Sequence, residues 1–163
     1  MAAITVSREL ASPVPQVWST LADFGGVHRF SPGVESSPIN EGTPASGVGA
    51  ERTCHLYDGN HIQERVIESV VNERLSIEVF DTSMPIKSAD ASITLEPTTS
   101  GGTRVTMAME YVVKFGPLGV VMDALMMKRT MTTSLDRLLA GLERHVETGE
   151  TIAKGWKPSP AVA

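Results

Sequence analysis

The sequence contains few of the residues that stabilise small secreted proteins. Its one cysteine, Cys54, cannot form an intramolecular disulfide. A chain of 163 residues does not need one, because a domain of this size buries about two thirds of its unfolded surface in one core. The N-terminal stretch MAAITVSREL also lacks the basic segment and apolar run of a secretory signal. We therefore expect one compact domain in the cytoplasm.

Positive charge and long apolar runs are scarce as well. The chain has 14 basic and 19 acidic residues and a net charge of −5, which disfavours nucleic acid and anionic membranes as main partners. Its longest apolar stretch, residues 118–127, is interrupted by Asp123 and is shorter than the ~20 residues that span a membrane. We expect no nucleic acid partner and no stable membrane insertion, and the pattern leaves monomer and homodimer open.

The common catalytic and cofactor motifs are also missing. The glycine pattern at residues 47–51 precedes a predicted strand instead of opening a helix, so it does not indicate a nucleotide loop. No Gly-x-Ser-x-Gly elbow marks a nucleophilic serine. The spacing of the four histidines is not that of metal ligands; they are His28, His55, His61 and His145. We expect neither a metal nor another cofactor.

The sequence does contain repeated apolar and polar alternation, which predicts strands. Residues 4–11 alternate with a period of two. Residues 50–57 and 60–71 alternate on either side of Asp58-Gly59, a strong hairpin signal. The other predicted strands cover residues 34–41, 75–79, 91–95 and 105–113. Tight connections between these seven strands predict an antiparallel meander.

Helical spacing appears in two places. Ser12-Pro13 predicts a helix start, and Gly25-Gly26 predicts its end, with room for one more turn over residues 27–30. Residues 118–148 carry an apolar stripe that predicts one long helix, which Gly149 ends. We expect a domain over residues 1–148 and a mobile tail over 149–163, in which Trp156 has no assigned role.

The predicted hairpin carries the polar residues of greatest interest. If Asp58 and Gly59 alone form its turn, His55 pairs with Ile62 and Thr53 with Glu64. The predicted inner face then holds Thr53, His55, Tyr57, Ile62, Glu64 and Val66, whereas Arg52 and Cys54 face solvent. A slip of one residue would invert this assignment.

Several motifs resemble one known family. Residues 12–24, SPVPQVWSTLADF, resemble the opening of the START-related SRPBCC superfamily, in its polyketide cyclase/dehydrase-like branch. Residues 30–34, Gly49, Glu64-Arg65 and residues 102–105 are similar to later family motifs in the same order. The resemblance implies an α+β helix-grip fold: a seven-stranded curved antiparallel sheet wraps around a long C-terminal helix, and two short helices follow strand one.

The family also implies a cavity for a sterol, lipid, polyketide, quinone, flavonoid or similar apolar molecule. Its members include carriers and enzymes, so the fold alone does not decide between them. We expect the ligand-binding residues to be His28, Phe30, His55, Tyr57, Glu64, Met107, Met109, Tyr111, Met122 and Met126. Methionine side chains adapt to variable apolar ligands, which favours binding.

Catalysis remains an alternative hypothesis. His55 and Glu64 on one face could act as general acid and base in a cyclase, dehydratase or isomerase reaction. The same pair could instead be a hydrogen-bonded part of the cavity wall. A third hypothesis is a protein-interaction module, which would expose an apolar patch and enclose no sizeable cavity.

Overall fold

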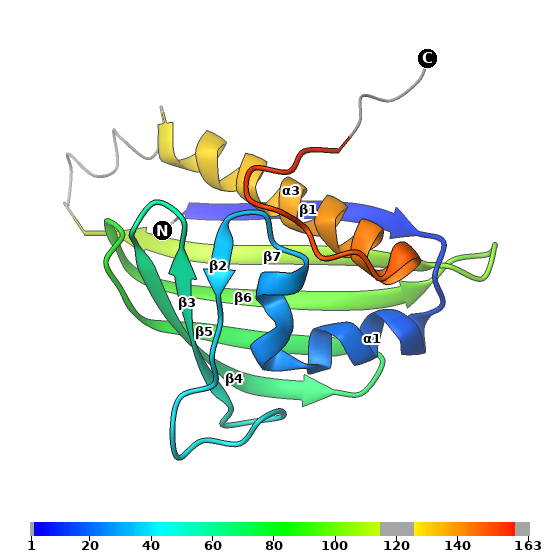
Figure 1. The fold of residues 1–163 in the computed structure, drawn as a ribbon, viewed down its shortest axis with the longest axis horizontal. Coiled ribbons are helices and arrows are strands. Elements are labelled where there is room, and N and C mark those ends of the chain that lie inside the picture. The colour runs from blue at the N-terminus through cyan, green and yellow to red at the C-terminus, as the bar shows by residue number, and fades with distance from the viewer. Residues whose placement is uncertain (1, 115–125, 159–163) are drawn as a thin grey trace.

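The computed structural model describes residues 2–114 and 126–158 (Figure 1). Its strands are β1 (Ala2–Leu10), β2 (Val34–Ser36), β3 (Glu51–Leu56), β4 (His61–Val70), β5 (Arg74–Thr82), β6 (Ile86–Pro97) and β7 (Thr103–Val113). Its helices are α1 (Val14–Ala22), the 3-10 helix η1 (Phe24–Arg29) and α3 (Lys128–Thr148). Residues 118–125 of the predicted long helix, Met122 among them, lie outside the described residues.

The strands form one antiparallel sheet with the order β1-β7-β6-β5-β4-β3-β2. The meander from β2 to β7 pairs neighbours in sequence, and β1 closes the other edge by pairing with β7. Figure 1 shows the sheet curving, with α3 lying along β1 and with α1 and η1 on the same side. This is the predicted helix-grip fold, so the α+β class, the seven strands and the two short helices after β1 are confirmed.

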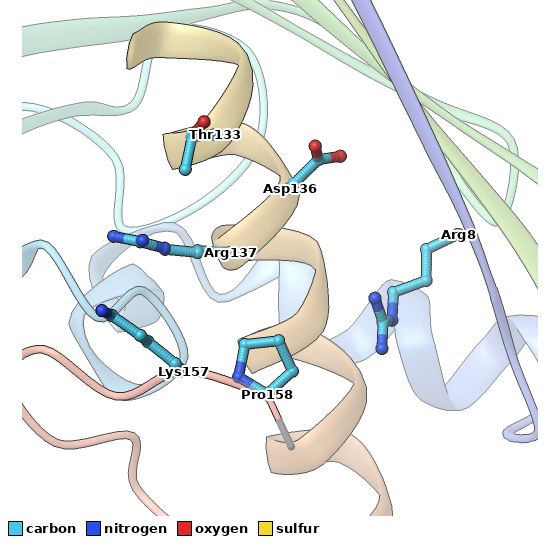
Figure 2. Close-up of a pocket in the computed structure, with 6 residues that line it drawn as sticks. All are labelled: Arg8, Thr133, Asp136, Arg137, Lys157 and Pro158. Carbon is cyan, nitrogen blue, oxygen red and sulfur yellow. The ribbon is translucent and has the colours of Figure 1, made fainter. Parts of the chain in front are cut away.

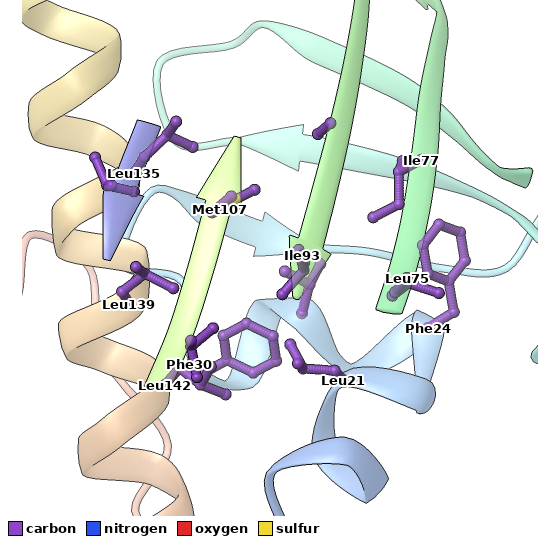
Figure 3. Packing of buried hydrophobic residues seen from close by; sticks show 14 of the residues in the cluster. Leu21, Phe24, Phe30, Leu75, Ile77, Ile93, Met107, Leu135, Leu139 and Leu142 are labelled. Carbon is purple, nitrogen blue, oxygen red and sulfur yellow. The ribbon is translucent and has the colours of Figure 1, made fainter. Parts of the chain in front are cut away.

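The core lies between this face of the sheet and the helices. Leu135, Leu139 and Leu142 are buried because they recur at helical spacing on one side of α3. Figure 3 shows them on the side of α3 next to β7, the strand that carries Met107, with Leu142 beside Phe30. The helix can approach this closely because it carries Gly141, where a Cβ would collide with the carbonyl oxygen of Phe30. One glycine therefore sets how near α3 lies to the end of η1.

The end of α3 is as predicted. Gly149 adopts a left-handed conformation with φ of 74°, and its N–H donates to the carbonyl of His145 at 2.8 Å. The following residues return along the domain: the N–H of Ile152 donates to the carbonyl of Arg29 at 2.9 Å, and the Ile152 side chain is buried. The predicted mobile tail therefore begins with a segment that packs on the domain through Ile152. The sequence did not indicate this contact, because a single buried side chain produces no periodic pattern.

The predicted β3–β4 register is wrong by one residue. The structure pairs Arg52 with Glu64, Cys54 with Ile62 and His55 with His61. The N–H of Leu56 donates to the carbonyl of Asn60, so the loop has three residues, ending in Gly59 with φ of 89°. A three-residue loop with a left-handed glycine is a common hairpin connection, and its additional residue shifts every pair.

This shift inverts β3 and leaves β4 as predicted. Arg52 and Cys54 point into the domain, whereas His55 is exposed. Glu64 still faces inward but lies opposite Arg52 instead of Thr53. On the other face, Arg65 Nε donates to Glu51 Oε1 at 2.8 Å. The predicted register also placed Arg52 opposite Arg65, and the true register replaces this pair of like charges with two pairs of opposite charge.

Candidate functional site

A cavity of about 540 Å³ lies between the sheet, the short helices and α3. Its wall is predominantly apolar because the inward positions of six strands, β2 to β7, and one stripe of α3 face it. The apolar lining comprises Leu21, Val27, Phe30, Val34, Leu56, Ile62, Leu75, Ile77, Val79, Met84, Ile86, Ala89, Ala91, Ile93, Met107, Met109, Met131, Leu135 and Leu138. Its volume is within the ~300 to 1,000 Å³ of typical small-molecule sites.

One ion pair interrupts this apolar wall. Arg52 Nε donates to Glu64 Oε2 at 2.6 Å, and the two side chains are 9% and 16% exposed. The guanidinium of Arg52 also donates to the carbonyl of Phe24 at 2.9 Å and lies 4.0 Å from the centre of the Phe24 ring. Three contacts hold Arg52 in place, so Glu64 is presented to the cavity in one fixed orientation.

Cys54 lies beside this pair as a protonated thiol. Its sulfur donates to Glu64 Oε2 at 3.5 Å. Burial raises the pKa of the Cys54 thiol far above its ordinary value, and the neighbouring Glu64 carboxylate raises it further. Because the thiolate is the nucleophilic form of cysteine, this side chain is unsuited to covalent catalysis.

The solvent-exposed part of the lining marks the rim of the cavity. The exposed rim residues are Gly33, Asp58, Thr130, Ser134, Arg137, Lys154 and Gly155. Lys154 Nζ lies 5.4 Å from the centre of the Tyr57 ring. The adjacent Trp156 also lines the cavity, and the N–H of Gly155 donates to the carbonyl of Pro32 at 3.4 Å. The segment after α3 therefore forms part of the rim, which gives Trp156 a structural role that its sequence context did not indicate.

The family model for polyketide cyclase / dehydrase and lipid transport matches residues 1–147. This chain belongs to that family. The match ends one residue before the end of α3, so the rim residues Lys154, Gly155 and Trp156 lie beyond it. No curated protein matches the chain.

Solved structures share the fold of this family member at low sequence identity. XoxI from Bacillus cereus is 19% identical, with a TM-score of 0.73 and coverage of 91% of this chain and 97% of its own. A START superfamily protein from Mycobacterium smegmatis is 15% identical, with a TM-score of 0.73 and coverage of 89% and 97%. DynU16, from the dynemicin biosynthetic locus, is 16% identical, with a TM-score of 0.68 and coverage of 95% and 51%.

The structure places five of the predicted site residues in the cavity of this family member. They are Phe30, Tyr57, Glu64, Met107 and Met109. The signals that located four of them were the inward positions of β4 and β7 and the residues that follow η1. Tyr57 lines the cavity from the loop after β3, although the register from which it was predicted is wrong.

Four other predicted site residues do not line the cavity. His28 Nδ1 lies 2.8 Å from Ser37 Oγ, and Tyr111 is buried outside the cavity lining. His55 is exposed opposite His61, and Met126 is 68% exposed. Met122 lies outside the described residues. The predicted catalytic pair of His55 and Glu64 is therefore not assembled, because the hairpin register turns His55 outward.

Sequence reasoning missed Arg52 and Cys54 as cavity residues. The signal that could have found them is the charge pattern of the hairpin: Glu51 and Arg52 can pair with Arg65 and Glu64 only in the register shifted by one residue. Within the described residues, no group of three His, Cys, Asp or Glu side chains is placed to hold a metal ion. None of the helices that the structure describes combines the length and apolarity needed to cross a bilayer.

Proposed function

We propose that this protein binds a small, mainly apolar or aromatic molecule in the cavity between the sheet and α3. The observation that carries the proposal is a cavity of about 540 Å³ whose apolar wall contains one buried ion pair. Cavities of this kind bury most of the surface of a small ligand, and a few fixed polar groups in the wall orient the ligand. The third hypothesis, a protein-interaction module without a sizeable cavity, is disfavoured by this volume.

Glu64 is suited to orient such a ligand. Its carboxylate accepts hydrogen bonds from Arg52 and Cys54, and both reach Oε2. Among the described residues, no hydrogen bond reaches Oε1, so this oxygen can accept from a hydroxyl or N–H of a bound molecule. A ligand with one such donor on an otherwise apolar frame fits the site best.

Binding is favoured over catalysis because the polar groups do not form a proton relay. The partner of Glu64 is a guanidinium, which keeps its proton in proteins, and not an imidazole. The family description names cyclase and dehydrase as well as lipid transport, so turnover is tested alongside binding. In an acid–base enzyme, Glu64→Gln should lower turnover by about a hundredfold or more, whereas a carrier should keep most of its affinity for apolar ligands.

The binding test uses a fluorescent apolar probe and a variant that fills the cavity. N-phenyl-1-naphthylamine brightens in an apolar environment, and lipids, quinones and aromatic polyketides can then compete with it. Ala91 on β6 lines the cavity, so Ala91→Phe should place a ring inside it and abolish probe binding. Ala108 on β7 alternates with the cavity residues Met107 and Met109, so Ala108→Phe is the matched change on the outer face.

The proposal requires wild type and Ala108→Phe to bind the probe and Ala91→Phe to lose it. Both variants should retain a cooperative thermal transition, which shows that they are folded. Equal binding by all three proteins would place the probe elsewhere and contradict the proposal. If none of the three proteins binds the probe or any compound of the competitor panel, the proposal is contradicted as well.

A further inference from the structure

The rim of the cavity carries positive charge, although the chain as a whole has a net charge of −5. Arg137 of α3 and Lys154 of the following segment both line it, and Asp58 is its one acidic residue among those described. A shallow surface pocket of about 320 Å³ adjoins the cavity and shares Arg137 with it. This pocket adds Lys157, and Figure 2 shows its side chain running in the same direction as that of Arg137.

Among the described residues, the acidic groups near this cluster form no ion pair with it. Figure 2 shows Asp136 pointing to the opposite side of α3 from Arg137, toward the side where Arg8 lies. Arg8 is already paired, since its Nε donates to Glu143 at 2.9 Å. Asp58 caps its own turn by accepting from the N–H of Asn60 at 2.9 Å.

Arg137 is unusual among the arginines of this chain. The chain has nine, of which seven form ion pairs: Arg8, Arg29, Arg52, Arg65, Arg74, Arg104 and Arg144. Within the described residues, Arg129 and Arg137 have no carboxylate partner, and only Arg137 lines the cavity. A guanidinium without a protein partner presents its donors to an external anion in the fork geometry that suits an oxyanion.

We propose that the ligand is an amphipathic anion. Its apolar body occupies the cavity, and its carboxylate, phosphate or similar oxyanion lies at the rim against Arg137 and Lys154, with Lys157 adding to the local field. This inference rests on the proposed function and specifies its ligand class. Two of the three cations, Lys154 and Lys157, follow the family match, which ends at residue 147. The charge preference thus depends largely on residues beyond the part of the chain that the family model matches.

The test uses two probes that differ in one anionic group. 8-Anilinonaphthalene-1-sulfonate is N-phenyl-1-naphthylamine with an added sulfonate, so the ratio of their dissociation constants isolates the contribution of charge. Arg137→Gln should weaken binding of the sulfonate probe by about tenfold, as expected for the loss of one charge-assisted contact, and change binding of the neutral probe by less than about twofold. Added salt should weaken the sulfonate probe alone.

Two further variants serve as controls. Arg129→Gln removes the other unpaired arginine of α3, which does not line the cavity, and should leave the affinity of both probes unchanged. Arg137→Lys keeps the charge without the fork and should fall between wild type and Arg137→Gln. Competition with dodecanoate, dodecyl phosphate and dodecan-1-ol then distinguishes a carboxylate from a phosphate ligand, with the alcohol as the weakest competitor.

The inference fails if Arg137→Gln and Arg129→Gln weaken the sulfonate probe equally, or if the alcohol competes as well as the two anions. In either case, the proposed function still holds if wild type binds the neutral probe and Ala91→Phe does not. If neither probe binds in the cavity, the proposed function fails first. The two failures are therefore distinguishable in one set of titrations.

Discussion

Replacement of Arg52 by methionine should destabilise the protein by about 3 kcal/mol, the lower end of the range for breaking a buried ion pair, because Glu64 faces a cavity and is not fully enclosed. Methionine keeps the apolar stem of the side chain. It removes the ion pair with Glu64, the hydrogen bond to the Phe24 carbonyl and the stacking on the Phe24 ring. The main loss comes from leaving the Glu64 carboxylate buried without a counter-charge.

Glu64→Leu should cost a similar amount, because it leaves the guanidinium of Arg52 buried with only the Phe24 carbonyl as a partner. The double variant Arg52→Met/Glu64→Leu should cost much less. It leaves no unpaired charge, so its remaining losses are the hydrogen bond to the Phe24 carbonyl, about 1 kcal/mol, and the stacking on the Phe24 ring, a further ~1 kcal/mol. The two single changes are thus expected to be strongly non-additive.

Urea denaturation of the four proteins measures this coupling, provided that the dependence on denaturant concentration is the same in each. Each single variant should also melt about 6 to 12 °C below wild type, at roughly 2 to 4 °C per kcal/mol for a domain of this size. If the double variant loses the sum of the two single losses to within about 0.5 kcal/mol, the two side chains are not coupled and the described pair does not form.

Two further predictions concern packing and titration. Gly141→Ala should destabilise the protein by calorimetry although alanine is the better helix former by about 1 kcal/mol, because its Cβ would collide with the Phe30 carbonyl. The control Gly33→Ala meets no atom within 4 Å and should melt near wild type; equal melting of both variants would refute the close approach. For Cys54, a pKa raised by burial means that the unfolded chain releases the thiol proton first, so stability should fall as pH rises above about 8.5. Cys54→Ala should remove that part of the pH dependence, seen as a smaller stability loss between neutral and alkaline pH; identical slopes would contradict it.

The strands were predictable because alternation reports directly which residues face the core. β1 illustrates this: Ile4, Val6 and Leu10 are buried and the residues between them are not. The end of α3 was predictable for a similarly local reason, since only a residue tolerant of positive φ can terminate it as Gly149 does.

The cavity residues were predicted only where local pattern was sufficient. Met107 and Met109 follow from the alternation of β7, which both of its neighbouring strands constrain. The face of β3 depends on whether the loop after Leu56 has two or three residues, and Asp-Gly is compatible with both. That one-residue difference moved His55 to the surface and brought Arg52 against Glu64.

The sequence by itself determined the fold class, the order of the elements and the apolar faces, because each depends on periodicity and on turn residues that act over a few positions. Only the tertiary structure decided the chemistry of the site. The Arg52–Glu64 pair depends on strand register, the position of Trp156 depends on the anchoring of Ile152, and the charged rim combines α3 with the segment that follows it. These are contacts between separate elements, and local sequence pattern does not encode the distances between them.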